Sequence, residues 1–406
     1  MGCGAIVCGG CKRASELIML YIDVTRLYEN QRRGKQITGV DRVSLAYIEQ
    51  FSSIACVVIR LSKQWLFLPK NQSNEIFANL IMKKPIRLPS RFFRFKYCRP
   101  ADGKNFLLHT AHNGLEKTNF IELMTFYDLR GIYFLHDLIP IEYPEYCRVG
   151  SYQQHRQRLL AMSKADMVIC NSYDVFNKFI GYCRANGLSL PKTIWAHLGV
   201  NNALNTQVIT PIIPDVVDNH PFFLMVGTIE GRKNHWLMLI VWRILIDEMG
   251  ESCPKLVIVG KRGWECEQVL ATLDRSINLK NCVVELNQCI DSQLTYLLTK
   301  TQALLFPSNA EGFGLPLVEA LLLRVPVIAS DIPIFQEIGL DVVKLLSPFD
   351  TAAWKDVIVE YMLPESEGRN NQIQKIESIQ DKLPTWQKHF EVVSKEISKL
   401  MKINID

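Results

Sequence analysis

The sequence predicts an α/β protein built from two Rossmann-like domains, and three observations carry this prediction. Short apolar segments alternate with segments of helical periodicity along both halves of the chain. The length of 406 residues exceeds what one hydrophobic core usually serves, about 250–300 residues. A polar, proline-containing stretch at Asn201–His220 separates the halves and is typical of an interdomain linker.

In the first half we expect buried strands of a parallel sheet with helices between them. The strands are expected at Leu20–Val24, Ala55–Leu61, Phe106–His109, Gly131–His136 and Met167–Asn171. The helices are expected at Asp41–Phe51, Arg148–Ala165 and Ser172–Asn186.

The second half repeats the strand–helix alternation. Its strands are expected at Phe222–Gly227, Lys255–Gly260, Val283–Leu286, Ala303–Pro307 and Val327–Ser330. Its helices are expected at Trp236–Met249, Trp264–Ile277, Ser292–Lys300 and Leu315–Leu323, with a last amphipathic helix at Thr385–Ile405. We therefore place a leader at 1–18, a first domain at 19–205, a second at 206–384 and the closing helix at 385–406. Facing Rossmann-like domains would bind ligands in a cleft at the carboxyl ends of both sheets.

Composition excludes several classes of protein. The chain is 48% hydrophobic and 21% charged, which is ordinary for a globular protein and argues against disorder. It holds no apolar run of about 18 residues, so no transmembrane helix is expected. Residues 1–200 carry a net charge of +12 and residues 201–406 a net charge of −7. This split suggests an anionic partner for the first half.

The cysteines indicate reduced thiols in a cytosolic protein, because the 12 of them are scattered over a long chain. Cys3, Cys8 and Cys11 cluster near the start, but a metal site there would lack a fourth ligand. The alternative is a disordered leader, with Met19 as a candidate true start. The first residues lack the order of a signal peptide.

The strongest local signal is a turn between a strand and a helix, Phe306-Pro-Ser-Asn-Ala-Glu-Gly-Phe-Gly-Leu-Pro-Leu-Val-Glu-Ala320. Glycines in the turn allow backbone amides to approach a ligand, and the helix start attracts an anion. Glu311 can accept hydrogen bonds from hydroxyls, while Glu319 lies among apolar residues and needs specific donors. This combination suits a sugar linked to a diphosphate; the alternative is a purely structural turn.

A second signal follows the strand Phe222–Gly227, where Arg232 and Lys233 stand side by side. Two cations at the carboxyl end of a strand are placed to bind phosphate oxygens, although such a pair can also be a solvated loop. In the first half, Ile37-Thr-Gly-Val-Asp-Arg-Val43 opens a helix, with Gly39 as a phosphate contact or Thr38 and Asp41 as a helix cap.

These motifs together resemble glycosyltransferase family 4, whose members have the GT-B fold and retain the anomeric configuration. The resemblance rests on Gly227-Thr-x-Glu-x-Arg-Lys-Asn234 and on the two glutamates of Glu311-Gly-Phe-Gly-Leu-Pro-x-x-Glu-Ala320. The Gly39 loop, the pair His136-Asp137 and the closing helix led by Thr385-Trp386 add to it. It spans most of the chain from Leu20 onward and points to mannosyltransferase-like enzymes of bacterial polysaccharide assembly.

The resemblance implies roles for individual residues. Arg232 and Lys233 would grip the donor diphosphate, Glu311 would bind the transferred sugar, and His136 would touch that sugar near the reacting centre. Glu319 would bind the ribose hydroxyls. Further donor contacts would come from Gly39, Gly227, Thr228, Gly260, Lys261, Phe313, Gly314 and Leu315. Candidate residues on the acceptor side are His109, His112 and Asp137.

A basic segment, Lys83–Arg99, interleaves seven cations with aromatic residues. It favours docking on an anionic bilayer, whereas a solvated loop or nucleic-acid binding are the alternatives, and no nucleic-acid motif accompanies it. The cations are Lys83, Lys84, Arg87, Arg91, Arg94, Lys96 and Arg99. Together with the resemblance, they suggest a peripheral enzyme at the inner face of the membrane with a lipid-linked saccharide acceptor.

We therefore predict a retaining hexosyltransferase with a nucleotide-diphosphate sugar as donor. GDP-mannose is favoured, and UDP- or dTDP-sugars stay open. No metal or other cofactor is expected, because Arg232 and Lys233 supply positive charge and no Asp-x-Asp motif occurs. The alternatives are a non-catalytic nucleotide-sugar-binding scaffold and a GT-B nucleotide-sugar epimerase.

Overall fold

The computed structural model describes residues 17–61, 64–200, 220–363 and 365–403. The chain divides into two compact units, of which the first runs to Thr110 and also takes Ile121–Ile132. The second takes Ala111–Phe120 and everything from Tyr133 onward. Residues 201–219 of the linker expected at Asn201–His220 lie outside the described residues, as do residues 1–16 of the expected leader, with its three cysteines.

The first unit is built around strand β1 (Ile18–Asp23), which pairs in parallel with β2 (Ala55–Arg60) and β4 (Lys104–His109). These strands are buried on both faces, which explains their continuous apolar runs. Strand β3 (Trp65–Phe67) pairs antiparallel with β2, so the expectation of a wholly parallel sheet was wrong at this edge. Strand β3 has only three residues, too few to show the alternation of apolar and polar residues that indicates a strand.

The full sheet has seven strands in the order β3-β2-β1-β4-β5-β6-β7. Its later strands are β5 (Leu129–Leu135), β6 (Met167–Cys170) and β7 (Lys192–Trp195). The helices connecting these seven strands are α1 (Thr25–Arg32), α2 (Gly39–Phe51), α3 (Lys70–Ile81), α4 (Phe120–Phe126), α5 (Ile139–Glu142), α6 (Ser151–Met162) and α7 (Tyr173–Ala185). Strand β7 was not predicted, because its four residues are partly exposed and carry no apolar run.

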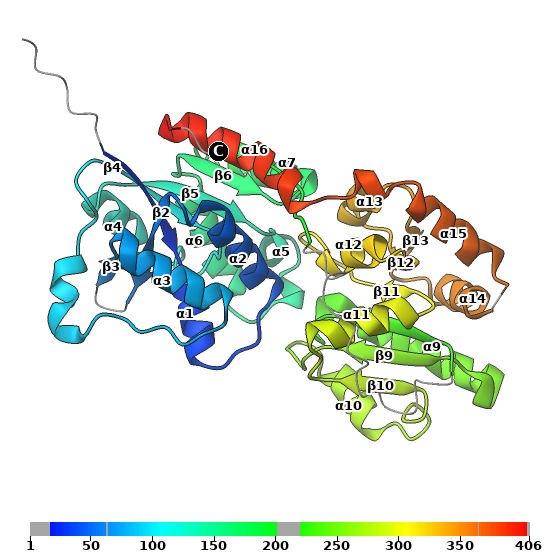
Figure 1. The fold of residues 1–406 in the computed structure, drawn as a ribbon. Coiled ribbons are helices and arrows are strands. Elements are labelled where there is room, and N and C mark those ends of the chain that lie inside the picture. Colours follow the sequence, from blue (N-terminus) through cyan, green and yellow to red (C-terminus); the bar gives the residue numbers. More distant parts are fainter. Residues whose placement is uncertain (1–16, 62–63, 201–219, 364, 404–406) are drawn as a thin grey trace, which may run out of the picture. The chain divides into compact units, whose positions relative to one another are not determined.

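The second sheet has six parallel strands in the order β10-β9-β8-β11-β12-β13. They are β8 (Phe222–Val226), β9 (Lys255–Val259), β10 (Val283–Leu286), β11 (Leu304–Phe306), β12 (Val327–Ser330) and β13 (Lys344–Leu346). Its helices are α9 (His235–Met249), α10 (Glu267–Arg275), α11 (Asp291–Lys300), α12 (Leu315–Leu322), α13 (Pro333–Gly339), α14 (Thr351–Met362) and α15 (Glu367–Glu377). Figure 1 shows these elements in chain order, with the second sheet in green to orange.

The core beside this sheet is centred on two fully buried indoles, Trp242 of α9 and Trp354 of α14. Each indole N–H finds a carbonyl, Pro254 O at 2.8 Å for Trp242 and Ser347 O at 2.9 Å for Trp354. Their polar atoms are therefore satisfied within an apolar layer, which keeps the strand ends at fixed positions.

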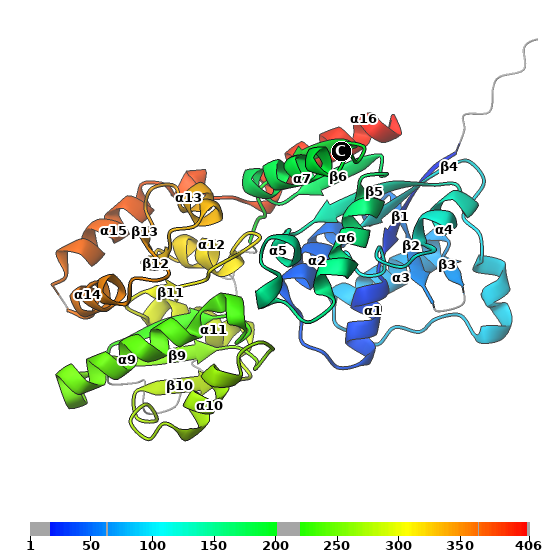
Figure 2. The ribbon, with the colours of Figure 1, turned by 180° about the vertical axis from the view of Figure 1, so that it is seen from behind.

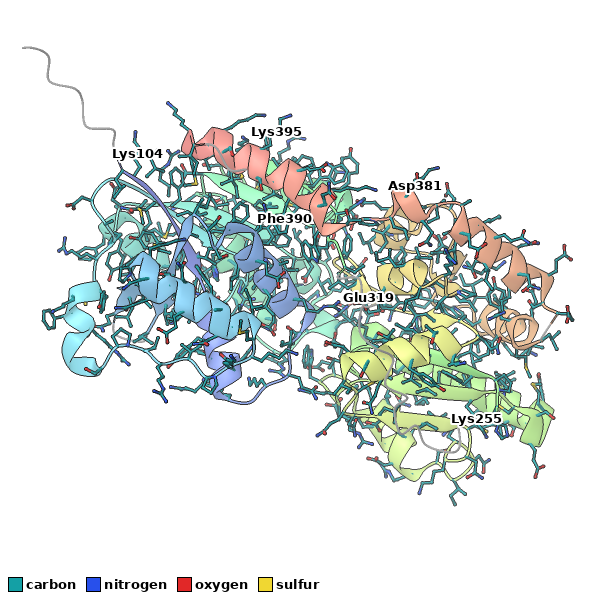
Figure 3. The ribbon with its side chains drawn as sticks, in the orientation of Figure 1. Lys104, Lys255, Glu319, Asp381, Phe390 and Lys395 are labelled. Atoms are coloured by element: carbon teal, nitrogen blue, oxygen red, sulfur yellow. The ribbon has the colours of Figure 1, made fainter. Side chains whose placement is uncertain are left out.

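The last helix, α16 (Trp386–Met401), returns to the seven-stranded sheet as predicted. Its His389 Nδ1 donates to the carbonyls of Ala196 and His197, at 3.2 and 3.0 Å. Lys192 of β7 forms an ion pair with Glu396 at 2.5 Å. Both views show α16 beside α7 and β6 (Figures 1 and 2), and its Lys395 lies on the exposed side (Figure 3). Among the described helices none is long and apolar enough to cross a bilayer.

Candidate active site

The predicted cations follow strand β8 through a tight turn. Gly227 has a positive φ of 141°, and a side chain there would meet Lys233 Cε at 3.3 Å. The turn then forms a short 3-10 helix at Gly231–Lys233 before α9 begins. Glycine is therefore needed at 227 to let the Lys233 chain lie over the backbone, where its ammonium is 4.7 Å from the centroid of the Phe306 ring.

Arg232 and Lys233 both contact the carboxylate of Glu311. Lys233 Nζ lies 2.5 Å from Glu311 Oε1, and an Arg232 amino nitrogen lies 2.6 Å from Oε2. The other amino nitrogen of Arg232 reaches Glu230 at 2.6 Å, and Ser308 donates to Glu311 at 2.8 Å. The structure thus brings the three predicted residues Arg232, Lys233 and Glu311 together with Glu230 and Ser308. We call these five residues the Glu311 cluster.

The electrostatics of the Glu311 cluster follow from burial and pairing. Burial opposes ionisation of Glu311, but Arg232 and Lys233 outweigh it and lower the pKa of this carboxyl to about 2. Burial lowers the pKa of Lys233, and burial also raises the pKa of Glu230. Against burial, Glu311 and Glu230 raise the pKa of Arg232. Glu311 is therefore ionised at neutral pH, and its negative charge offsets the charges of Arg232 and Lys233. An anion bound at this cluster would share these two cations with the Glu311 carboxylate.

The loop that carries Glu311 runs from Pro307 to Gly314, and we call it the α12 loop. Gly314 precedes α12 with φ of 105°, and a side chain at this position would meet the Phe335 ring at 2.9 Å. The backbone N–H groups of Phe313, Gly314 and Leu315 have no hydrogen-bond partner within the described part of the chain. They stand at the start of α12, where helix geometry favours an anion.

Glu319 lies on α12, one turn from the α12 loop (Figure 3). Its side chain is half-buried. Glu311 lies in the α12 loop and Glu319 in the helix itself, so the two predicted carboxylates occupy separate positions.

His136 lies against the α12 loop. A side chain at Gly312 would stand 2.3 Å from the His136 carbonyl oxygen, so only glycine allows this approach. The His136 backbone N–H donates to His112 Nε2 at 2.9 Å, and the two rings are 4.8 Å apart. His112 therefore accepts with Nε2, which assigns the proton of its neutral ring to Nδ1.

Asp137 is held beside His136 by a neighbouring histidine. His155 of α6 is buried and donates through Nε2 to the Asp137 carbonyl at 3.1 Å. The Asp137 carboxylate accepts from the Ile139 backbone N–H at 3.1 Å. Its negative charge also contributes to raising the pKa of Arg232. The pair His136-Asp137 thus lies within electrostatic reach of the Glu311 cluster.

Two further predicted donor contacts, Gly260 and Lys261, lie in the turn that follows β9. A side chain at Gly260 would meet the Gly227 carbonyl at 1.8 Å, so this turn packs directly on the turn that precedes Arg232. Thr228 is half-buried between them and Lys261 is exposed. Arg262 is used elsewhere, in ion pairs with Asp274 at 2.6 Å and Glu285 at 2.8 Å.

Two predicted residues belong to the first unit. Thr38 and Asp41 form a capping box at the start of α2, as the capping alternative predicted. Gly39 is the first residue of this helix and is exposed. His109 ends β4 fully buried, with Nδ1 3.4 Å from Asp23 and Nε2 3.3 Å from Arg60. Arg60 also forms a hydrogen bond with Asp23. This buried group of charges lies at the carboxyl ends of β1, β2 and β4.

The basic segment contains a loop followed by a 3-10 helix, η1 (Arg91–Tyr97). Five of its cations are exposed: Lys83, Lys84, Arg87, Lys96 and Arg99. Arg94 is half-buried and donates to the Pro89 carbonyl at 3.0 Å. Phe95 stands out with 68% exposure. The segment therefore presents positive charge and an aromatic ring together on the surface.

Sequence reasoning did not assign a role to four residues that shape this region. They are Glu230, Ser308, His155 and Asn171, whose side-chain amide donates to the His136 carbonyl at 2.8 Å. Glu230 lies within the motif Gly227–Asn234, two residues before Arg232. A role beside that cation could therefore have been predicted for it. The other three residues carry no local sequence signal, because the folded structure alone brings them to the site.

Residues 212–377 match the family model Glycosyl transferases group 1. The chain is 32% identical over 243 residues to the serotype-specific mannosyltransferase WbdA of Escherichia coli, a match that covers 57% of this chain and 29% of WbdA. It is 30% identical over 151 residues to the O-antigen chain mannosyltransferase RfbU of Salmonella typhimurium, covering 37% of this chain and 41% of RfbU. The chain thus matches less than half the length of these curated relatives.

The fold is similar to that of Anabaena HepE, whose crystal structure contains UDP. The TM-score is 0.61 at 16% identity, over 94% of this chain and all of the HepE chain. This likeness in fold identifies the α/β architecture, with its two Rossmann-like sheets, as GT-B.

Proposed function

We propose that this chain transfers a hexose from a nucleotide-diphosphate sugar to a saccharide acceptor, since residues 212–377 match the family model Glycosyl transferases group 1. One observation supports the proposal above all others. Arg232 and Lys233 contact Glu311 at the end of β8, beside the amides that begin α12 and that find no partner among the described residues. Cations, a carboxylate and helix-start amides together fit a sugar attached to a diphosphate.

In the proposed reaction the bond between the anomeric carbon and the donor phosphate breaks. Negative charge grows on the departing phosphate oxygen while the anomeric carbon becomes cationic. Arg232, Lys233 and the amides of the α12 loop stabilise that charge where it develops. The acceptor hydroxyl forms the new bond to the anomeric carbon, and its proton passes to the departing phosphate oxygen.

Glu311 and His136 orient the sugar in this proposal. The Glu311 carboxylate is ionised, so it accepts hydrogen bonds from sugar hydroxyls. The His136 backbone is held by His112 and Asn171 against Gly312, which supports a fixed position beside the sugar. We propose attack on the face that the phosphate leaves, with retention of configuration.

GDP-mannose is the donor that we favour, since curated relatives are named mannosyltransferases. UDP- and dTDP-sugars are the alternatives to be tested. The reaction is proposed to proceed without a metal ion, because Arg232 and Lys233 offset the diphosphate charge. The acceptor is proposed to be a lipid-linked saccharide used in surface polysaccharide synthesis.

We further propose that the enzyme works at the inner face of the membrane, docked through the basic segment. Its exposed cations attract anionic headgroups, and each is expected to contribute about 1 kcal/mol near such a surface. The exposed Phe95 adds an apolar contact at the boundary.

A transfer assay tests the proposed function. The purified chain is incubated in EDTA with GDP-mannose, UDP-glucose or dTDP-glucose and with lipid-linked saccharide extracts, and products are read by mass spectrometry. Gain of one hexose by the acceptor is expected from the wild type and not from Arg232→Ala. Turnover that requires Mg²⁺ would overturn metal independence while leaving the transfer itself in place.

A further inference from the structure

A row of aromatic rings leads from the α12 loop to the surface. Ring centroids are 5.9 Å apart for Phe313 and His197, 5.3 Å for His197 and Trp195, and 5.6 Å for Trp195 and Tyr173. Phe176 stacks on Tyr173 at 6.1 Å with 17° between the ring planes. Exposure rises along the row, from 4% at Phe313 to 39% at Trp195 and 51% at Tyr173.

The backbone fixes the two exposed rings next to each other. Trp195 ends the edge strand β7 and pairs in register with Cys170, which ends β6. Tyr173 is the first residue of α7, three residues after Cys170. Both rings therefore stand where the same two strands end.

Glu337 of α13 ties the row in place. Its carboxylate accepts from the backbone N–H groups of Tyr173 and Asp174, at 2.7 and 2.9 Å, and pairs with His197 Nε2 at 2.5 Å. These bonds use the Tyr173 main chain and leave its phenol ring exposed. Views from both sides show α13 near the start of α7 (Figures 1 and 2).

The exposed rings carry unused donors. Within the described residues neither the Tyr173 hydroxyl nor the Trp195 indole N–H has a hydrogen-bond partner. Aromatic rings have a negative face, and the C–H groups of a sugar are positively polarised by their oxygens. A pyranose can therefore stack on such a ring while its hydroxyls meet the indole N–H and the phenol.

We propose that Trp195 and Tyr173 form a binding surface for the saccharide chain of the acceptor, with Phe313 marking the end nearest the Glu311 cluster. The inference rests on the proposed function, because it assigns a place to that reaction's acceptor. We call Tyr173, Trp195 and His197 the aromatic surface.

Charge around the aromatic surface favours a neutral ligand over an anionic bilayer. Lys178 pairs with Asp174 at 2.8 Å and with Glu142 at 3.1 Å, and Lys192 pairs with Glu396. The neighbouring cations are thus already matched by carboxylates, which offset their attraction for an anionic surface. A polyhydroxylated chain needs no net charge at its site.

Affinity electrophoresis of the full chain in native gels with soluble α-mannan tests the inference. The wild type should be retarded relative to a gel without polysaccharide. Trp195→Ala and Tyr173→Ala should each weaken apparent binding by about tenfold or more, as truncated aromatic anchors commonly do. Trp195→Phe should keep most of the retardation, since it keeps a stacking face.

Phe349→Ala is the matched control, because Phe349 is 81% exposed in another part of the molecule. Thermal unfolding of each variant checks that it is folded. A wild type that α-mannan does not retard, or folded Ala variants retarded like the wild type, would overturn the saccharide surface. Retardation that needs Trp195 in a chain that transfers no hexose would overturn the proposed function and leave this surface standing.

Discussion

Lys233 Nζ and the Glu311 carboxylate are 2.5 Å apart, although one residue follows β8 and the other follows β11. The contact exists because β8 and β11 are neighbours in the six-stranded sheet and both end at the same edge. It makes Glu311 both a partner of the cations and a carboxylate available to a sugar. The same carboxylate should therefore affect diphosphate binding and transfer in opposite directions.

Glu311→Gln should separate these two effects. The neutral amide no longer offsets Arg232 and Lys233, so nucleoside diphosphate should bind as tightly as to the wild type or more tightly. Transfer should fall about 100-fold, because a sugar-orienting acceptor is lost. Calorimetric titration with GDP and UDP, together with initial rates, measures both. The control is Glu285→Gln, which affects an exposed pair with Arg262.

Arg232→Lys should not rescue the function of Arg232. The guanidinium contacts Glu230 and Glu311 at once, and a lysine ammonium cannot span both with the same geometry. We expect kcat to fall by about 100-fold or more, as for other removed groups that stabilise developing charge. Lys355→Arg, in an exposed pair with Glu248, should leave kcat unchanged. Equal rates for Arg232→Lys and wild type would contradict the assigned role.

Gly312→Ala should damage both stability and transfer. Its Cβ would lie 2.3 Å from the His136 carbonyl oxygen, so the α12 loop or the end of β5 must move. Gly181→Ala is the matched control, since a Cβ there meets nothing within 4 Å. Thermal unfolding and initial rates compare the two. A Gly312→Ala protein as active as Gly181→Ala would show that the close approach is dispensable.

His389 should make the free energy of unfolding depend on pH. Burial lowers the pKa of His389 to about 4, against 6.5 for a free ring. Between these values the unfolded chain binds the extra proton, so stability is fully present above about pH 6.5 and falls as the pH drops toward 4. His389→Gln should reduce that slope by up to about 1.4 kcal/mol per pH unit. Urea unfolding from pH 7 to pH 4 measures it, and an unchanged slope would contradict the prediction.

Neutralising the basic segment should weaken binding to anionic vesicles. Lys83, Lys84, Arg87 and Lys96 are the exposed cations that this prediction changes. Their replacement by Gln should lower the fraction that floats with phosphatidylglycerol vesicles, and more so at low salt. The control replaces Lys300, Lys382, Lys388 and Lys395, which are exposed elsewhere. Equal flotation of both variants would exclude docking through this segment.

The sequence predicted the parallel architecture well because its strands are buried on both faces. Runs such as Leu256–Val259 are apolar without interruption, as expected of a strand covered on both faces. Strands β7 and β13 were missed because both are partly exposed and begin with a lysine, so that no buried apolar run marks them. A strand that forms mainly because it pairs with a neighbouring strand cannot be recognised from the periodicity of its own residues.

The candidate site was predictable as far as its residues lie in local turns. Arg232, Lys233 and Glu311 each follow a recognisable strand, and the fold brings them together. The packing of Gly312 on His136 was not predictable, because it joins residues far apart in sequence. The same holds for the row of rings that runs from Phe313 to Tyr173, whose members come from separate elements.

Calorimetric titration of the chain with GDP and UDP in EDTA tests the central claim most directly. We expect the wild type to bind a nucleoside diphosphate, and the double variant Arg232→Ala/Lys233→Ala to bind at least about 100-fold more weakly, because both phosphate-facing cations are gone. Lys355→Ala should bind like the wild type. A folded double variant that binds as tightly as the wild type would contradict a diphosphate site at the Glu311 cluster.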